Sequence, residues 1–251
     1  MTAITSLLRD ARTPTRGPIP DRIADHDWSG LFASLDERGF ARLPCLLEPE
    51  ECADITKLYD HTAHFRSRVV MDRHGFGRGE YQYFAYPLPP VVKQLRHALY
   101  AQLVDYSNHW QELLGRAARF PPAHGEFLAT CHAADQRRPT PLLLRYGAGD
   151  FNCLHQDLYG EHVFPLQMAV LLSRPERDFT GGEFVLTEQR PRQQSRVEVV
   201  PLSHGDAVIF AVNERPVRGG RGHYRVKMRH GVSRVLAGQR HTLGIILHDA
   251  L

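Results

Sequence analysis

The chain has 251 residues, of which 42% are hydrophobic and 24% are charged, and its formal net charge is +3. This composition is typical of a globular protein with one large domain, and no stretch approaches the roughly 18 uninterrupted apolar residues of a membrane span. The first twenty residues also lack the apolar core and the cleavage site of a secretory signal. We therefore expect a flexible lead-in over residues 1–24, a single domain over residues 25–251, and a cytoplasmic protein.

The cysteines agree with a reducing compartment, because they form no Cys-x-x-Cys pair and no spacing typical of a disulfide framework or a zinc site. Cys45, Cys52 and Cys131 are expected to be plain buried thiols. Cys153 differs from them because it stands two residues before His155.

The first half of the domain, residues 25–140, is expected to form a helical support and a lid. Apolar residues at helical spacing, acids and proline in first turns, and terminal glycines indicate its helices. The expected elements are a helix from Trp28 to Gly39, an edge strand over residues 40–47, a helix opening at Glu48, a strand or lid over residues 75–86 with packing aromatic rings, and a long helix over residues 91–115.

From Pro141 to the C-terminus the sequence changes to short apolar runs separated by turns rich in glycine, proline and arginine. Many short strands at roughly 8–12-residue spacing, with no helices between them, predict a mainly β jelly-roll core over residues 141–251. The expected strands cover residues 142–146, 163–172, 183–186, 197–202, 207–212, 224–235 and 242–248.

His155 and Asp157 stand two residues apart, so on a strand both side chains would leave the same face and could hold one metal ion. His230 is the preferred third ligand, because an arginine follows it at a suitable spacing, while His162 and His223 are alternatives. Two histidines and one carboxylate are the ligand set of non-haem Fe(II) oxygenases.

Arg240 follows His230 by ten residues, after a turn that contains glycine. In a hairpin it would lie on the neighbouring strand, close to the metal, where its planar guanidinium could hold a carboxylate through two parallel hydrogen bonds. The surrounding stretch is either a solvated basic face or an anion-binding surface. Its basic residues are Arg215, Arg218, Arg221, Arg225, Lys227, Arg229, Arg234 and Arg240.

Other polar residues near the expected strands have more than one interpretation. Asn152 and Gln167 could point into the pocket, although a hydrogen-bonded structural role is the more frequent outcome for such amides. Gly181 and Gly182 favour a tight turn or a close backbone approach. His248 is expected to be structural.

These motifs resemble the Fe(II)- and 2-oxoglutarate-dependent dioxygenases. More closely, the chain resembles a bacterial family within them that is described as oxidatively demethylating damaged DNA. The resemblance covers nearly the whole chain, and it is carried by the segments Phe76–Tyr81, Arg138–Pro141, Leu154–Gly160, Asp178–Phe184 and Arg229–Ser233.

The resemblance implies a double-stranded β-helix of the jelly-roll class with N-terminal helices. It also implies a reaction in which O2 and 2-oxoglutarate are consumed and a substrate C–H is hydroxylated, with release of formaldehyde from an N-methyl group. The implied site residues are His155, Asp157 and His230 as ligands of Fe(II), and Arg240, Tyr146 and Thr242 as partners of the distal carboxylate of 2-oxoglutarate.

Three classes of function remain open at this stage. The first is oxidation of alkylated DNA or RNA bases, favoured by the family resemblance and the basic stretch. The second is hydroxylation of a prolyl-type peptide or a small molecule, because the ten-residue spacing of His230 and Arg240 resembles the prolyl-hydroxylase branch. In the alkylated-base demethylases the arginine lies much farther beyond the distal histidine. The third is a jelly-roll binding module without turnover.

Overall fold

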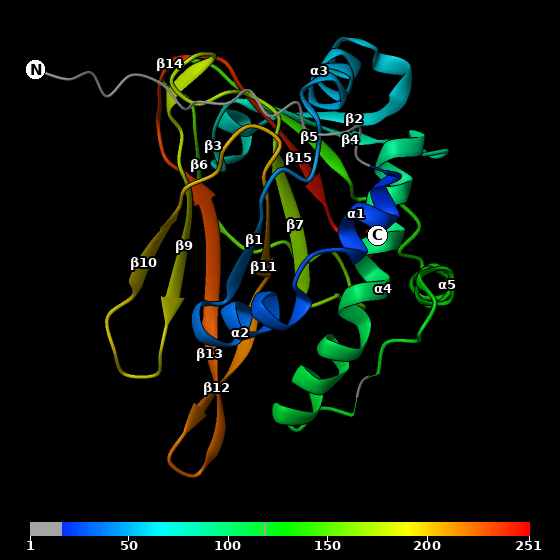
Figure 1. The fold of residues 1–251 in the computed structure, drawn as a ribbon, viewed down its shortest axis with the longest axis vertical. Helices are drawn as coiled ribbons and strands as arrows, with labels where there is room; N and C mark the ends of the chain where they lie inside the picture. Colours follow the sequence, from blue (N-terminus) through cyan, green and yellow to red (C-terminus); the bar gives the residue numbers. More distant parts are fainter. Residues whose placement is uncertain (1–16, 118) are drawn as a thin grey trace, which may run out of the picture.

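The computed structural model describes residues 17–117 and 119–251, which form two facing β-sheets with helices on the outer side of one of them (Figure 1). None of the helices in these two ranges combines the length and the apolar composition needed to cross a membrane. The helices longer than one turn are α1 (Ile19–Ala24), α2 (Trp28–Arg38), α3 (Pro49–Lys57), α4 (Pro90–Leu113) and α5 (His124–Ala133).

Both sheets are built from antiparallel pairs. The larger sheet has the order β1 (Phe40–Leu43), β11 (Ala207–Ala211), β7 (Leu166–Leu171), β15 (Arg240–Ile245), β5 (Leu142–Tyr146), β4 (Glu80–Phe84) and β2 (Phe65–Val70). The smaller sheet has the order β10 (Arg196–Val200), β9 (Phe184–Gln189), β13 (Gly222–Val232), β6 (Phe151–His155) and β3 (Gly77–Arg78), with β12 (Glu214–Gly219) paired to β13. A separate ribbon joins β14 (Val235–Gly238) to β8 (Phe179–Gly181). This arrangement confirms the expected double-stranded β-helix with helical support.

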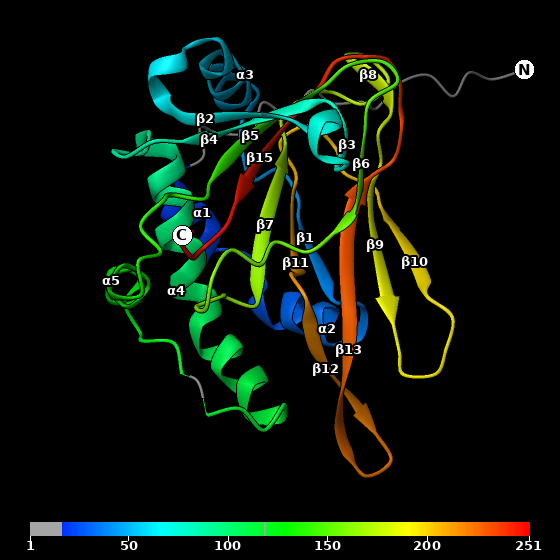
Figure 2. The same cartoon turned by 180° about the vertical axis from the view of Figure 1, so that it is seen from behind.

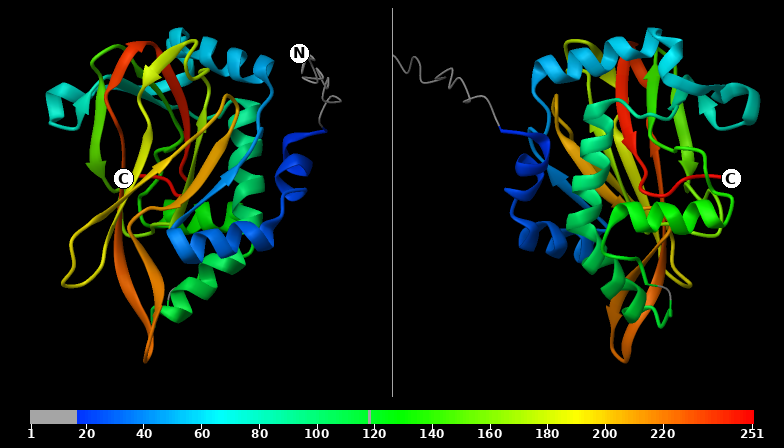
Figure 3. Two further views of the ribbon diagram at one scale, coloured as in Figure 1. Left: turned by 60° about the vertical axis from the view of Figure 1, so that its left-hand side comes forward. Right: turned by 90° about the vertical axis from the view of Figure 1, so that its right-hand side faces the viewer.

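Strands β7 and β11 of the larger sheet are buried on both faces, which explains why they read as nearly continuous apolar runs. In β11, Ile209 belongs to the hydrophobic cluster that includes Leu99 of α4, on the outer face. The next residue, Phe210, packs between the sheets with its ring 4.9 Å from that of Phe184 on β9. Figures 2 and 3 show α4 and α5 on the outer side of this sheet. The space between the two sheets is therefore shielded by helices on one side.

The expected helices are confirmed where their end signals are strong. Asp27 caps α2 by accepting a hydrogen bond from the backbone N–H of Gly30 at 3.1 Å, and Gly39 ends it in a left-handed conformation with φ +79°. A capping box between Glu48 and Glu51 starts α3. The long helix α4 spans nearly the predicted range.

The N-terminal half differs from its expected role in three ways. The expected lead-in includes α1, whose Arg22 binds the carboxylate of Glu51 at 2.6 and 2.8 Å, and residues 1–16 lie outside the described part of the chain. Helix α5 was not expected. Strands β1 to β4 belong to the two sheets, so residues 25–140 contribute to the β core as well as to its support.

The cysteine predictions hold in part. Cys52 and Cys131 are buried, as expected. Cys45 is exposed, because it follows the end of the edge strand β1 instead of lying within a longer strand, so its expected burial is wrong. Cys153 on β6 is also exposed.

A buried polar network fixes the C-terminal segment beyond β15. Arg96 of α4 donates to Asp249 at 2.7 Å and to the carbonyl of Ile246 at 2.8 Å. Asp249 also accepts from Tyr86 at 2.9 Å and lies 2.8 Å from His132 Nε2. His248 is buried beside this network, and its Nδ1 accepts a hydrogen bond from the backbone N–H of Phe164 at 3.3 Å, which agrees with its expected structural role.

Candidate active site

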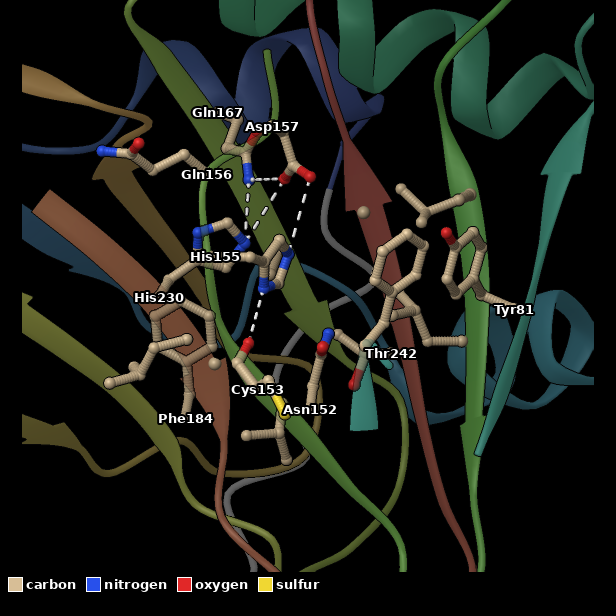
Figure 4. A pocket seen from close by; sticks show the side chains of 18 of the residues that line it. Tyr81, Asn152, Cys153, His155, Gln156, Asp157, Gln167, Phe184, His230 and Thr242 are labelled. Carbon is tan, nitrogen blue, oxygen red and sulfur yellow. Dashed lines mark hydrogen bonds and ion pairs between the residues drawn. The ribbon is translucent and has the colours of Figure 1, made fainter. Parts of the chain in front are cut away.

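The three expected metal ligands come together between the sheets. His155 ends β6, His230 lies opposite it in register on β13, and Asp157 follows two residues after β6 (Figure 4). Each offers a ligand atom, and these atoms lie within 4.8 Å of one another. Neither rival histidine joins this group: His223 is exposed at the start of β13, and His162 lies beside Gln136.

The sequence predicted that Asp157 and His155 leave the same face of one strand. This prediction is wrong, because β6 ends at His155. Gln156 is held away from the group by hydrogen bonds from its Nε2 to Asn213 Oδ1 and to the carbonyl of Met228, both at 2.7 Å (Figure 4). The chain beyond the strand then directs the buried carboxylate of Asp157 inward. The two ligands converge through a turn instead of through strand alternation.

A hydrogen bond to the backbone orients the imidazole of His155 toward the carboxylate, whereas the buried Nδ1 of His230 has no hydrogen-bond partner among the described residues. His155 Nδ1 lies 2.8 Å from the carbonyl oxygen of Cys153, a contact that leaves Nε2 facing Asp157 Oδ1 at 3.5 Å. His230 Nε2 lies 3.3 Å from Asp157 Oδ2. A metal-binding histidine commonly donates its second nitrogen to a carbonyl in this way, which fixes its tautomer.

The protonation states suit metal binding. Burial opposes ionisation of Asp157, but the hydrogen bond and charge of His230, with smaller effects of His155 and Tyr159, hold the pKa of the carboxyl well below its usual range. Burial, followed by the nearby His155, lowers the pKa of His230. An ionised carboxylate beside a neutral imidazole is the form in which these groups bind a metal.

Two side chains that sequence reasoning did not assign hold the Asp157 carboxylate. Tyr159 donates to Oδ1 at 2.6 Å, and Gln167 Nε2 donates to Oδ2 at 2.7 Å. Tyr83 Oη lies 3.0 Å from Tyr159 Oη, which extends the network to β4. Gln167 was detectable in sequence as an isolated polar residue in the apolar strand β7, whereas Tyr159 carried no comparable signal.

Arg240 lies on the inner face of the larger sheet, across the cavity from His230. Strand β15 is buried along its whole length, and its residues alternate between two environments. Leu243 and Ile245 pack in the cluster that contains α4, whereas Arg240, Thr242 and Gly244 line the cavity. The alternation therefore places the arginine and the hydroxyl on one face, as predicted.

The expected hairpin between His230 and Arg240 is wrong. After β13 the chain leaves the smaller sheet, pairs with β8 through β14, and joins the larger sheet as β15 between β5 and β7. Gly182, at φ +65°, lies beside this crossover, where a Cβ would approach Arg240 Cδ to 3.0 Å. Arg240 thus faces His230 from the opposite sheet.

Arg240 is a buried cation without an acidic partner among the described residues. Its side chain is 1% exposed, its Nη1 donates to Thr242 Oγ1, and its Nε has no hydrogen-bond partner. Burial lowers the pKa of the guanidinium to about 10. The ring of Tyr146 lies 5.7 Å from it, and the hydroxyl of Tyr146 accepts from Asn152 Nδ2 at 3.3 Å. A desolvated guanidinium of this kind is suited to a carboxylate ligand.

These groups line one cavity of about 310 Å³ between the sheets. The histidines and Asp157 belong to its wall on the smaller sheet and the adjoining loop, and Arg240, Thr242 and Tyr146 belong to its wall on the larger sheet. The expected lid segment crosses from one sheet to the other as β3 and β4, and exposed Phe76 lies in it at the rim. The rest of the lining is mainly apolar and includes Leu142, Leu144, Leu154, Ala169, Phe184 and Ile246.

A double-stranded β-helix with two histidines and a carboxylate facing a buried arginine defines the class of Fe(II)- and 2-oxoglutarate-dependent oxygenases. Residues 79–250 match the model of the Oxygenase-NA family, described as an oxygenase catalysing oxidative methylation of damaged DNA. The chain belongs to this family.

The chain is also similar to a bacterial relative and to solved structures. An uncharacterized protein of Mycobacterium tuberculosis is 49% identical over 167 residues, which cover 66% of this chain and 72% of that protein. An oxidoreductase of the 2OG-Fe(II) oxygenase family from Burkholderia pseudomallei superposes with a TM-score of 0.52 at 18% identity, over 90% of this chain and 93% of that one. A prolyl hydroxylase from Trichoplax adhaerens, solved with a hypoxia inducible factor peptide, superposes with a TM-score of 0.51 at 11% identity, over 92% of both chains. At these identities the two structures show a shared fold.

Proposed function

We propose that this oxygenase oxidises alkylated bases of nucleic acid. In this proposal His155, Asp157 and His230 hold Fe(II), and Arg240 holds the distal carboxylate of 2-oxoglutarate. The cosubstrate assignment rests on the buried guanidinium of Arg240, which has no acidic partner among the described residues and lies on the wall opposite the three ligand side chains. A buried cation without an acid is costly unless a ligand supplies the opposite charge. The substrate assignment is supported by the match of residues 79–250 to a family described as acting on damaged DNA.

The three ligand side chains suit a catalytic iron site better than a structural metal site. Two imidazoles and one carboxylate leave open positions on the ion, as non-haem iron oxygenases require. When bound, iron and 2-oxoglutarate supply the oxidising power, with O2 consumed and 2-oxoglutarate converted to succinate and CO2.

The chain's own residues position the reactants and exclude water. Arg240 orients the carboxylate of the cosubstrate with the hydroxyls of Thr242 and Tyr146, and Asn152 holds Tyr146 in place through its amide. Tyr159 and Gln167 keep Asp157 from rotating. The apolar lining leaves few polar groups to compete with these contacts.

Formaldehyde release tests the substrate assignment. The purified protein with Fe(II), 2-oxoglutarate and O2 is expected to release formaldehyde from DNA or RNA that carries N-methylated bases, and none from the unmethylated strand. If no such substrate releases formaldehyde and a peptide gains the mass of one oxygen, the proposal of a base substrate is rejected and the enzyme is a peptide hydroxylase. Succinate formation without any prime substrate would exclude a binding module that has lost turnover.

Removing the hydroxyl of Tyr159 is expected to weaken metal binding without unfolding the protein. Groups that orient a metal ligand typically contribute about 10–100-fold in metal affinity or activity. We expect Tyr159→Phe to raise the dissociation constant for Co(II), measured by its visible absorption, within that range, because Asp157 Oδ1 loses its 2.6 Å donor. Tyr106→Phe, which removes a hydroxyl bound to Asp36 on the helical side, is the matched control. Equal Co(II) affinity in Tyr159→Phe and wild type would contradict the role.

A further inference from the structure

Two loops of the smaller sheet form a basic surface outside the cavity. The β9–β10 loop and the β12–β13 hairpin project from the same end of the molecule (Figures 1 and 3). A groove of about 650 Å³ runs beside them. Its lining includes Gln189, Arg190, Arg192, His223, Tyr224, Arg225 and Lys227. Most of the basic stretch noted in the sequence lies on this hairpin.

The positive charge of the chain is concentrated in this region. Residues 188–229 contain nine arginines and lysines against four acids, a net charge of +5, whereas the whole chain carries +3. All other residues together therefore carry −2. The excess of positive charge belongs to one part of the protein and is not spread over its surface.

The acids of the region neutralise only part of its positive charge, since Glu188 pairs with Arg190 at 2.6 Å and Glu198 pairs with Arg196 at 3.4 Å. Glu188 is 3% exposed and binds the buried Arg215, so this arginine does not belong to the surface. Glu214 is shared among Arg116, Arg225 and Lys227. Four exposed arginines have no ion pair with an acid in the described ranges: Arg192, Arg218, Arg221 and Arg229.

Strand β13 connects this surface to the candidate active site. Its side chains alternate, so His230 faces the cavity while Arg225, Lys227 and Arg229 face outward. At roughly 3.4 Å per residue, the outward row from Arg225 to Arg229 spans about 14 Å. This length corresponds to about four steps between the phosphates of one duplex strand, which follow one another at roughly 3.4 Å along the helix axis. The row is too long for a single phosphate and matches a polyanion with regularly spaced charges.

We propose that the outward face of β13, with the β9–β10 loop and the β12–β13 hairpin, binds the phosphate backbone of the nucleic acid whose base enters the cavity. This inference rests on the proposed function for its substrate class. The hairpin turn, Gly219 to Gly222, carries Arg221 and no apolar side chain that could enter a lipid bilayer, which favours nucleic acid over a membrane surface.

Charge reversal on the hairpin tests the proposal. The hairpin variant carries three charge reversals, Arg218→Glu, Arg221→Glu and Arg225→Glu. A control variant makes the same change in net charge at exposed sites on α3, on α4 and after α5, through Lys57→Glu, Lys93→Glu and Arg137→Glu. Binding of a fluorescent single-stranded methylated oligonucleotide is measured by anisotropy from low to moderate salt. We expect the hairpin variant to bind about tenfold or more weakly at low salt, with a salt slope reduced by about 2.

The control triple is expected to bind close to wild type, and succinate formation without prime substrate is expected to be unchanged in both triples. Equal losses of binding in the two triples would overturn the proposal, even where formaldehyde release from methylated DNA succeeds. Binding of wild type to anionic vesicles but not to the oligonucleotide would overturn it as well. Succinate formation then shows separately whether the iron and 2-oxoglutarate site is intact.

Discussion

Replacing Asp157 by alanine is expected to abolish turnover and to weaken Fe(II) binding by more than about 100-fold, beyond the effect typical of groups that only orient a ligand. The change removes the single anionic group of the ligand set. It also leaves the donors on Tyr159 and Gln167 without their acceptor. Metal affinity is measured by anaerobic Fe(II) titration and turnover by succinate formation.

Two further variants separate loss of the ligand from loss of the fold. Asp157→Asn keeps the shape of the side chain and should also lose metal binding, because an amide is a weaker ligand than a carboxylate. Asp54→Ala removes an exposed carboxylate on α3 and should leave both measurements unchanged. Circular dichroism should show the same secondary structure in all three. Wild-type metal affinity in Asp157→Ala would remove this residue from the ligand set.

Replacing Arg240 by methionine is expected to raise the 2-oxoglutarate concentration needed for half-maximal rate by about 100-fold. Hydrogen bonds to a charged group contribute about 1.5–3 kcal/mol each, so two parallel bonds to one carboxylate at the lower end of this range account for a change of about 100-fold. The folded protein should lose little stability without the cosubstrate, because the guanidinium is buried without an acidic partner. A rise in the 2-oxoglutarate requirement at unchanged thermal stability is the expected signature.

Thermal melting provides a readout that does not depend on turnover. 2-Oxoglutarate with a redox-inert metal should raise the melting temperature of the wild type and have little effect on Arg240→Met, since a ligand stabilises a protein only where its concentration exceeds its dissociation constant. Arg174→Met, at an exposed arginine paired with Asp178, is the matched control and should respond like the wild type. Equal stabilisation of Arg240→Met and wild type would reject the assignment of Arg240.

Regular periodicity explains which elements were predictable. The apolar stripe of α4 and the apolar runs of β7 and β11 each follow from one repeating pattern. Helix α5 was missed because its buried residues include His124 and Cys131 beside Phe127, which gives little contrast between its faces. The strands β8 and β14 were missed because they have three and four residues and pair only with each other.

In the candidate active site, too, local patterns were predictable from the sequence and long-range relations were not. Residue types and short spacings selected His155 with Asp157 and Arg240 with Thr242, because ligand chemistry and strand alternation act locally, although only the second pair shares a strand face. His230 was preferred to its rivals only because an arginine follows it at a suitable spacing. The sequence did not show that the two groups face each other from opposite sheets. That relation depends on where the chain crosses between sheets after β13, which is set by the pairing of β14 with β8. The contacts of Tyr159 and Gln167 with Asp157 likewise depend on long-range packing, because the turn after β6 and strand β7 meet only when the two sheets close around the cavity.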